Sequence, residues 1–330
     1  MVLHRRRKFD VIGGRETPEK IVLSRRRLFG AAGLATGIIS AAGLTGYAAW
    51  RRWRGTDQEV LAAGKINAEM STRRYPAPRD TRFAYGRAET REAVAARYTN
   101  FYEFSVFKWS WKYVEPFHAS PWRLVIGGRC RNPMQMDMDD LLRRFGGHLV
   151  ERQYRHRCVE RWAMCVPWTG IPLAEIIRAA DPLPQATHVR FQTFYRPHEA
   201  AGVTKWPDFP WPYTEGLTLA EATNELTLLV TGMYGHPLLK QHGAPVRLVV
   251  PWKYGYKSIK SIVRIDFISR QPATFWNTAN ASMYPFQSNV DPDVALPWPQ
   301  GSEHELGSGQ RFKTQRYNGY ADFVAHLYEP

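Results

Sequence analysis

The stretch RHRCVERWAMCVPWTGIPL, residues 155–173, decides how this sequence is interpreted. It holds two cysteines, two tryptophans, two prolines and four charged residues, an unusual mixture for a hydrophobic core. Cys158 has Arg155, His156, Arg157 and Glu160 as neighbours. A positively charged surrounding lowers the pKa of a thiol and favours the thiolate, which is a ligand for soft or high-valent metals. The stretch therefore favours a metal-binding thiolate at Cys158 over a packed core residue.

The cysteine count restricts what these thiols do. The chain has three cysteines, Cys130, Cys158 and Cys165, and an odd number leaves at least one without a partner in the same chain. Cys158 and Cys165 are seven residues apart, which is neither a C-x-x-C redox motif nor half of a tetrahedral zinc set. The alternative is that all three are buried apolar thiols, which suits Cys130 and Cys165 better than Cys158.

The charge of the chain is concentrated at its N-terminus. The net charge is +15, and residues 1–54 hold 12 Lys and Arg against 3 Asp and Glu. Residues 55–330 hold 33 against 27, so the body of the protein is only mildly basic. A nucleic-acid-binding face needs charge clustered on the folded surface. We therefore expect no nucleic-acid partner.

The N-terminal region has the pattern of an export signal. Ser24-Arg25-Arg26 is followed by Leu28-Phe29, and no charge occurs from Leu28 to Trp50. This resembles a twin-arginine signal, which exports folded proteins. The uncharged run is also long enough to span a bilayer, so cleavage and retention as a membrane anchor are both kept as alternatives. We predict a signal or anchor region over 1–54 and a periplasmic protein, either free or associated with the membrane through this segment.

The rest of the chain predicts an α+β fold that is mainly β. Polar residues and prolines over 55–95 indicate an extended linker, and 96–330 form one domain. A helix is expected after Asp137, its N-cap, ending before Gly146-Gly147. A second helix is expected over 171–180, with Leu173, Ile176, Ile177 and Ala180 on its apolar face. Strands are expected within 122–128, 188–194, 226–234, 244–252 and 261–269. Strands and helices do not alternate at constant spacing, which argues against a Rossmann sheet or a TIM barrel.

A second region rich in charged and aromatic residues is QHGAPVRLVVPWKYGYKSIKSIVRI, residues 241–265. Its lysines at 253, 257 and 260 are interleaved with aromatic residues at 252, 254 and 256. Cationic groups beside a glycine-containing turn can hold a phosphate, and the aromatic rings suit a groove for a flat anionic heterocycle. The alternative is a solvated basic hairpin.

Together, these two regions resemble the sulfite oxidase family of molybdopterin enzymes. The segments NFYEF at 100–104, FWN at 275–277 and RYNGYADFVAHLY at 316–328 agree with one subgroup, the catalytic subunits of bacterial periplasmic protein-methionine-sulfoxide reductases. The resemblance covers about residues 95–330. It implies a sulfite-oxidase-type molybdopterin-binding domain, a Mo-molybdopterin cofactor, and a thiolate ligand to molybdenum at the position of Cys158.

The same resemblance implies further site residues. Tyr284 matches an aromatic residue close to the metal, and with Cys158 it forms the expected catalytic pair. The sequence departs from the family pattern at Thr99 and His242, where relatives have asparagine, and at Ser258, where they have glycine. The expected cofactor-binding residues are Thr99, Asn100, Tyr102, Glu103, Thr193, His242, Arg247, Ser258, Ile259 and Lys260.

The implied activity is the transfer of one oxygen atom from methionine sulfoxide in oxidised periplasmic proteins. The resemblance also implies a monomeric catalytic subunit that receives electrons from a membrane haem-containing partner. A sulfite dehydrogenase and a reductase of small S- or N-oxides are alternatives of the same class. A metal-free exported binding protein and a thiol-disulfide oxidoreductase are alternatives of other classes.

Overall fold

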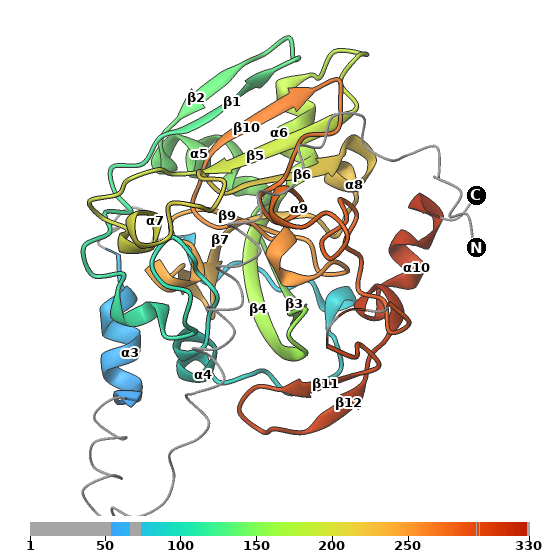
Figure 1. Cartoon of the computed structure of the whole chain (residues 1–330). Helices are drawn as coiled ribbons and strands as arrows, with labels where there is room; N and C mark the ends of the chain where they lie inside the picture. The colour runs from blue at the N-terminus through green and yellow to red at the C-terminus, as the bar shows by residue number, and fades with distance from the viewer. Residues whose placement is uncertain (1–53, 67–73, 295, 297, 329–330) are drawn as a thin grey trace, which may run out of the picture.

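The computed structural model describes residues 54–66, 74–294, 296 and 298–328, and it contains two β-sheets (Figure 1). The five-stranded sheet has the order β2 (Met134–Met136), β1 (Leu124–Gly128), β10 (Ile262–Ile268), β5 (His188–Thr193) and β6 (Thr214–Thr218). The seven-stranded sheet contains β12 (Arg311–Lys313), β11 (Ser302–Glu305), β4 (Trp162–Pro172), β7 (Leu228–Met233) and β8 (His236–Pro237), with β3 (Val150–Arg157) on β4 and β9 (Arg247–Val249) on β7.

Short helices lie around these sheets. The α-helices are α3 (Asp57–Gly64), α4 (Glu92–Arg97), α5 (Met138–Phe145), α6 (Leu173–Ala180), α7 (Ala201–Lys205), α8 (Leu219–Thr223), α9 (Phe275–Ala279) and α10 (Ala321–Val324). Most strand pairs are antiparallel, while β1 runs parallel to β10 and β4 parallel to β11. Mixed sheets with few and short helices confirm the predicted α+β, mainly β class.

The elements expected from local patterns are present. The Asp137 side chain accepts a hydrogen bond from the Asp140 N–H, 2.8 Å away, and caps α5 as predicted. The apolar face predicted for α6 is buried, and strands β1, β5, β7, β9 and β10 lie within their predicted ranges. These elements form where hydrophobic periodicity and capping residues agree.

The longest strand pair was not predicted. β3 and β4 run antiparallel from the Val150–Gly170 pair to the Arg157–Ala163 pair. β4 is buried almost throughout, and a continuous apolar run does not distinguish a strand from a buried helix. β3 carries several charged residues that are nevertheless buried, so it lacks the alternation that marks a strand. Figure 1 shows this pair below the five-stranded sheet.

Residues 55–95, predicted as an extended linker, contain the helix α3 instead. Thr56 and Glu59 form a reciprocal capping box at its start, a signal that was present in the sequence. Val60 of α3 packs with Ala96 and Trp111, and the Gln241 side chain donates to the Val60 carbonyl at 3.1 Å. The helix is therefore packed against the domain rather than extended from it.

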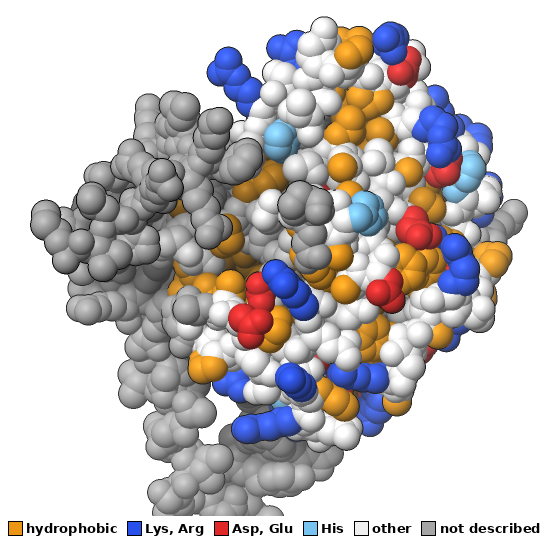
Figure 2. All heavy atoms as spheres, turned by 90° about the vertical axis from the view of Figure 1, so that its right-hand side faces the viewer, with side chains coloured by type: hydrophobic (Ala, Val, Ile, Leu, Met, Phe, Trp, Pro, Cys, Tyr) orange, Lys and Arg blue, Asp and Glu red, His pale blue; other side chains and the backbone are white. Residues whose placement is uncertain are grey.

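The predicted signal or anchor region falls almost entirely outside the described residues, which begin at residue 54. Among the residues that are described, no helix has the length and apolar character needed to cross a bilayer. On the face shown in Figure 2, the described basic and acidic side chains are interspersed with hydrophobic and neutral ones.

A partly buried contact between His236 and Glu92 predicts that the stability of the protein depends on pH. His236 Nε2 lies 2.6 Å from the Glu92 carboxylate and its Nδ1 lies 2.7 Å from the Pro237 carbonyl. Both partners are acceptors, so both ring nitrogens carry protons, and the Glu92 hydrogen bond raises the pKa of His236 above 6.5 against the effect of burial. This stabilisation is complete below pH 6.5 and is lost as the pH rises through the raised pKa of the folded state.

We therefore expect the urea midpoint of the wild type to fall as the pH is raised above 6.5. The side chain of His236 is 38% exposed, so solvent screening keeps the effect below about 1 kcal/mol. Glu92→Gln should flatten the pH dependence, because the amide does not favour the imidazolium. Identical pH profiles for the wild type and the variant would contradict this assignment.

Candidate active site

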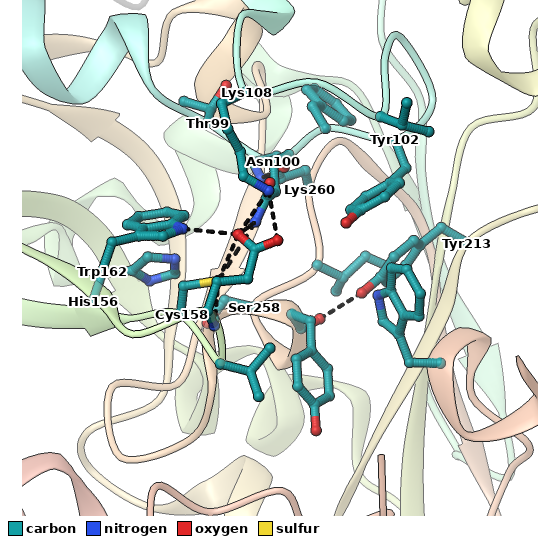
Figure 3. Close-up of a pocket in the computed structure, with 18 of the residues that line it drawn as sticks. Thr99, Asn100, Tyr102, Lys108, His156, Cys158, Trp162, Tyr213, Ser258 and Lys260 are labelled. Atoms are coloured by element: carbon teal, nitrogen blue, oxygen red, sulfur yellow. Dashed lines mark hydrogen bonds and ion pairs between the residues drawn. The ribbon is translucent and has the colours of Figure 1, made fainter. Parts of the chain in front are cut away.

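A cavity of about 710 Å³ is lined by residues of the seven-stranded sheet, of α9 and of the connecting loops (Figure 3). Nearly all the residues that the sequence predicted for the site line this cavity. Figure 3 shows His156, Cys158 and Trp162 on one side of the cavity and Tyr102 and Tyr213 on the other. The predicted residues that line it are Cys158, Tyr284, Thr99, Asn100, Tyr102, Glu103, His242, Arg247, Ser258, Ile259 and Lys260.

Thr193 is the predicted residue that does not line this cavity. Its side chain is fully buried, and its hydroxyl donates to the Ser261 carbonyl at 3.0 Å. Thr193 therefore hydrogen-bonds to the backbone that follows Lys260 and does not line the cavity.

Cys158 lies in the tight turn that joins β3 to β4. Its N–H donates to the Trp162 carbonyl at 2.9 Å, and its carbonyl accepts from the Arg161 N–H at 2.9 Å. The Glu160 N–H and the Asn100 amide nitrogen each lie 3.5 Å from the Cys158 sulfur. The hairpin thus fixes the sulfur at the cavity wall with two donors directed at it.

The expected low pKa of Cys158 is wrong for the protein without its metal. Burial raises the pKa of the thiol to about 12, and the Glu160 charge adds to this effect. The neighbouring arginines do not compensate, because Arg155 and Arg157 form buried ion pairs with Glu303. A metal ion at the sulfur would supply the missing positive charge, since coordination deprotonates a thiol outright.

Glu160 is a site residue to which the sequence assigned no role. Its carboxylate accepts from the Lys108 ammonium at 2.6 Å, the Trp162 indole N–H at 3.0 Å and the Asn100 amide at 3.4 Å. Burial raises the pKa of Glu160, but the Lys108 charge and these donors bring it below the ordinary value. An ionised carboxylate therefore stands beside Cys158. Its position two residues after Cys158 was visible in the sequence, but its contact with Lys108 was not.

Buried cationic and imidazole groups form a second part of the cavity. Arg247 is fully buried and donates to the carbonyls of His242 at 2.8 Å and Ser258 at 3.0 Å. Burial, with the charges of Arg247 and Lys260, holds the pKa of His156 and His242 well below the ordinary value. Both rings are therefore neutral at physiological pH, so each can donate and accept one hydrogen bond.

The pKa values of Glu103 and Lys260, which also line this part of the cavity, are shifted in opposite directions. Burial raises the pKa of the Glu103 carboxyl, and burial with the Arg247 charge lowers the pKa of Lys260. The Lys260 ammonium donates to the Asn100 carbonyl at 2.5 Å. Lys260 thereby connects the segment around Asn100 to the loop that follows β9.

Two of the lysines that suggested a phosphate site face away from the cavity. Lys253 pairs with Glu221 at 2.5 Å, and Lys257 pairs with Glu215 at 2.7 Å. All four side chains are buried. Neither the phosphate hypothesis nor the solvated hairpin holds for these two lysines, whereas Lys260 does line the cavity.

The cavity has the properties needed for a pterin that carries a metal. Two buried atoms of its lining, Asn100 Oδ1 and His242 Nε2, have no hydrogen-bond partner among the described residues. Buried polar atoms of this kind are usually satisfied by a partner, so they indicate a polar ligand. No group of three or more His, Cys, Asp or Glu that could hold a metal occurs in the described part of the chain. A metal at Cys158 would therefore need further ligands from its cofactor.

Gly202 supports this cavity from outside. Its N–H donates to the Glu103 carbonyl at 2.8 Å, and an added Cβ would lie 2.1 Å from the Tyr102 carbonyl oxygen. We expect Gly202→Ala to destabilise the protein by about 1–3 kcal/mol and to lower its molybdenum content, because residues 102–103 must move. Urea unfolding and elemental analysis measure both effects. Gly147→Ala is the control, since nothing lies within 4 Å of its added Cβ. Equal behaviour of the two variants would contradict the proposed support.

Comparisons with known proteins agree with this geometry. Residues 112–276 match the family model described as the oxidoreductase molybdopterin binding domain. The chain is 41% identical to the "Protein-methionine-sulfoxide reductase catalytic subunit MsrP" of Burkholderia mallei, over 97% of this chain and 93% of that protein. It is 44% identical to the protein of the same name from Xanthomonas axonopodis pv. citri, over 76% of this chain and 80% of the relative. The sulfane dehydrogenase SoxCD of Paracoccus pantotrophus is a distant structural neighbour, with 15% identity, a TM-score of 0.39 and coverage of 61% of this chain and 46% of that one.

Proposed function

This chain belongs to the family of protein-methionine-sulfoxide reductase catalytic subunits, and we propose that it reduces methionine sulfoxide in proteins at a molybdenum centre bound through Cys158. The single observation that carries the proposal is the Cys158 sulfur, held at the wall of a cavity whose lining also contains Asn100 Oδ1 and His242 Nε2, two buried atoms without a hydrogen-bond partner among the described residues. The protein is an oxidoreductase, and its cofactor is Mo-molybdopterin.

The residues around the cavity divide into two groups by what they can hold. Cys158 would bind the metal, while His242, Arg247 and Lys260 would hold the polar pterin and its phosphate. When bound, the molybdenum cofactor supplies the two-electron chemistry that takes the oxygen atom from the sulfoxide sulfur. The chain itself therefore has to bind the sulfoxide, orient its oxygen and deliver protons.

Protons are needed because the oxygen atom finally leaves as water. Lys108 lies at the cavity, is partly exposed, and donates to the Glu160 carboxylate at 2.6 Å. The pair connects solvent to the region around the Cys158 sulfur, which lies 3.6 Å from the same carboxylate. Lys108 and Glu160 are therefore placed to pass protons toward the substrate oxygen.

The relatives are named catalytic subunits, which implies a partner subunit. Such a partner would supply the electrons that each turnover uses, and we propose that it is a membrane protein that carries haem. The proposed export through the twin-arginine route rests on Ser24-Arg25-Arg26 and the uncharged run up to Trp50. We therefore propose that the enzyme acts at the periplasmic side of the membrane, where oxidised periplasmic proteins would be its substrates.

The proposal is tested with protein purified from a host that makes the pterin cofactor. Reduction of methionine sulfoxide in an oxidised protein and of trimethylamine N-oxide is followed with a reduced viologen dye, and oxidation of sulfite with ferricyanide. We expect kcat/KM for methionine sulfoxide to exceed the other two by about tenfold or more. A higher value for sulfite would replace the proposal by a sulfite dehydrogenase, and a higher value for the N-oxide by a reductase of small oxides.

A further inference from the structure

One wall of the cavity comes from α9 and the turn that follows it. Trp276, Asn280, Met283 and Tyr284 all line the cavity: Trp276 lies in α9, Asn280 is its extended C-cap residue, and Met283 and Tyr284 lie in the turn that follows. The Asn280 N–H donates to the Trp276 carbonyl at 2.8 Å, and the Tyr284 N–H donates to the Asn280 carbonyl at 3.0 Å. The first bond closes α9 at its C-cap and the second closes the turn after it, and the side chains of both segments line the same cavity.

Trp276 is at the centre of the aromatic rings on this wall. Its ring centroid lies 5.0 Å from that of Tyr102, 5.1 Å from that of Tyr284 and 5.9 Å from that of Phe209. In Figure 3, Tyr102 lies across the cavity from Cys158. This wall is therefore aromatic, whereas the opposite side, with Cys158, Glu160 and Lys108, is polar.

This wall is held rigidly before any substrate arrives. The Asn277 amide donates to the Tyr284 carbonyl at 2.9 Å, and the Asn280 side-chain oxygen accepts from the Met283 N–H at 3.0 Å. Phe275 stacks on Tyr213 with 4.5 Å between centroids and 16° between planes. A wall fixed in this way can distinguish ligands that differ by one methylene group.

The side chain of methionine sulfoxide has the polarity that such a cavity fits. Its oxygen accepts hydrogen bonds, and donors lie on the polar side at Asn100 and Lys108. Its sulfur carries partial positive charge, and the attached methyl is apolar. Sulfur and positively polarised groups bind favourably to aromatic rings, with the strongest attraction to the indole of tryptophan.

We infer that Trp276, with Tyr102 and Met283, recognises the S-methyl group of methionine sulfoxide and makes Trp276 a specificity-determining residue. The inference rests on the proposed function and deepens it. The oxygen of the substrate faces Asn100 and the Cys158 side, and its methyl group contacts the aromatic wall. A larger S-alkyl group would clash with the aromatic rings of this wall and bind less well.

The test compares N-acetylmethionine sulfoxide with N-acetylethionine sulfoxide, which has one more methylene on sulfur. We expect the wild type to prefer the S-methyl substrate by about tenfold or more in kcat/KM. Trp276→Leu should bring this ratio close to one, mainly through KM of the methyl substrate, and Trp276→Phe should restore part of it. The binding of methionine sulfone, measured by calorimetry, should weaken in parallel in Trp276→Leu.

Trp211→Leu is the matched control. Trp211 packs against Phe275 at 5.0 Å between centroids, and its indole donates to the Trp206 carbonyl at 2.8 Å, but it does not line the cavity. It should keep the wild-type ratio. Molybdenum content is measured for each variant, and if Trp276→Leu does not load the metal, the ratio is measured in Trp276→Phe and Met283→Ala.

The outcomes separate this inference from the proposed function. A wild type that reduces neither sulfoxide contradicts the proposed function itself. A wild type that reduces both, with a ratio that stays unchanged in the loaded Trp276 variants or in Met283→Ala, contradicts the inference alone. An equal loss for both substrates shows that Trp276 has only a structural role, and it also overturns the inference.

Discussion

Replacing Cys158 by serine is expected to remove molybdenum from the protein and to lower methionine sulfoxide reduction by more than about 100-fold. The Cys158 sulfur is the soft ligand at the cavity, and no cluster of His, Cys, Asp or Glu in the described part of the chain can replace it. Loss of a residue that only orients a metal ligand already costs about 10–100-fold, so loss of the ligand itself costs more. Elemental analysis and the viologen assay measure both effects on one preparation.

Cys130→Ser is the control for this variant. Cys130 is partly exposed and does not line the cavity, so its loss should leave the molybdenum content and the activity of the wild type unchanged. Cys158→Ser protein that retains both the metal and the activity would show that the metal is held elsewhere. An equal loss in both cysteine variants would indicate a general effect on folding.

Replacing Glu303 by glutamine is expected to lower the free energy of unfolding by about 3–5 kcal/mol. Glu303 forms ion pairs with both Arg155 and Arg157, whose side chains are fully buried. Without the carboxylate, Arg157 loses its buried counter-ion and Arg155 keeps only Glu305, at 2.7 Å. Uncompensated buried charge is costly because desolvation is no longer offset by a partner.

Urea unfolding measures this loss, and the variant should also be less active. The Arg157 guanidinium donates to the carbonyl of Cys158, so the ion-pair cluster fixes the backbone at the metal ligand. Arg178→Gln is the control, because it breaks an ion pair with Glu175 in which Arg178 is 70% exposed. That change should cost less than about 1 kcal/mol. A loss for Glu303→Gln as small as this control would contradict the structural role of the cluster.

Local sequence signals predicted much of the periphery of the fold. The helix α5 and its Asp137 cap follow from short-range chemistry, as does the apolar face of α6. The β3–β4 pair escaped prediction because the charges of β3 are satisfied by residues distant in sequence: Arg155 pairs with Glu303 and Glu305, and Glu151 pairs with Arg79. Ion pairs between residues so far apart in the chain leave no pattern in the local sequence.

Motif resemblance predicted the residues of the candidate site better than it predicted their electrostatics. It identified Cys158, Tyr284 and all but one of the expected cofactor residues in a single cavity, the exception being Thr193. The predicted direction of the Cys158 pKa shift was wrong, because burial of the thiol and the Glu160 charge raise the pKa, while the adjacent arginines are paired with the buried Glu303 carboxylate. The phosphate hypothesis for Lys253 was wrong for a similar reason, because its charge is paired with Glu221, which is distant in sequence.

The sequence assigned no role to two other residues of the site. Lys108 and Trp276 line the cavity, but Lys108 is a single lysine outside any motif, and the FWN motif that contains Trp276 indicated the family and not what the ring contacts. Their roles emerge from contacts with Glu160 and with Tyr102, respectively, which only the folded chain brings about.

The most direct test of the central claim is the reduction of methionine sulfoxide in an oxidised protein by the wild-type chain, prepared in medium with and without molybdate. Mass spectrometry of the substrate protein reports the conversion of its methionine sulfoxide to methionine. We predict conversion only with the protein prepared with molybdate. Equal conversion by both preparations, or none by protein that contains molybdenum, would contradict a molybdenum-dependent methionine sulfoxide reductase.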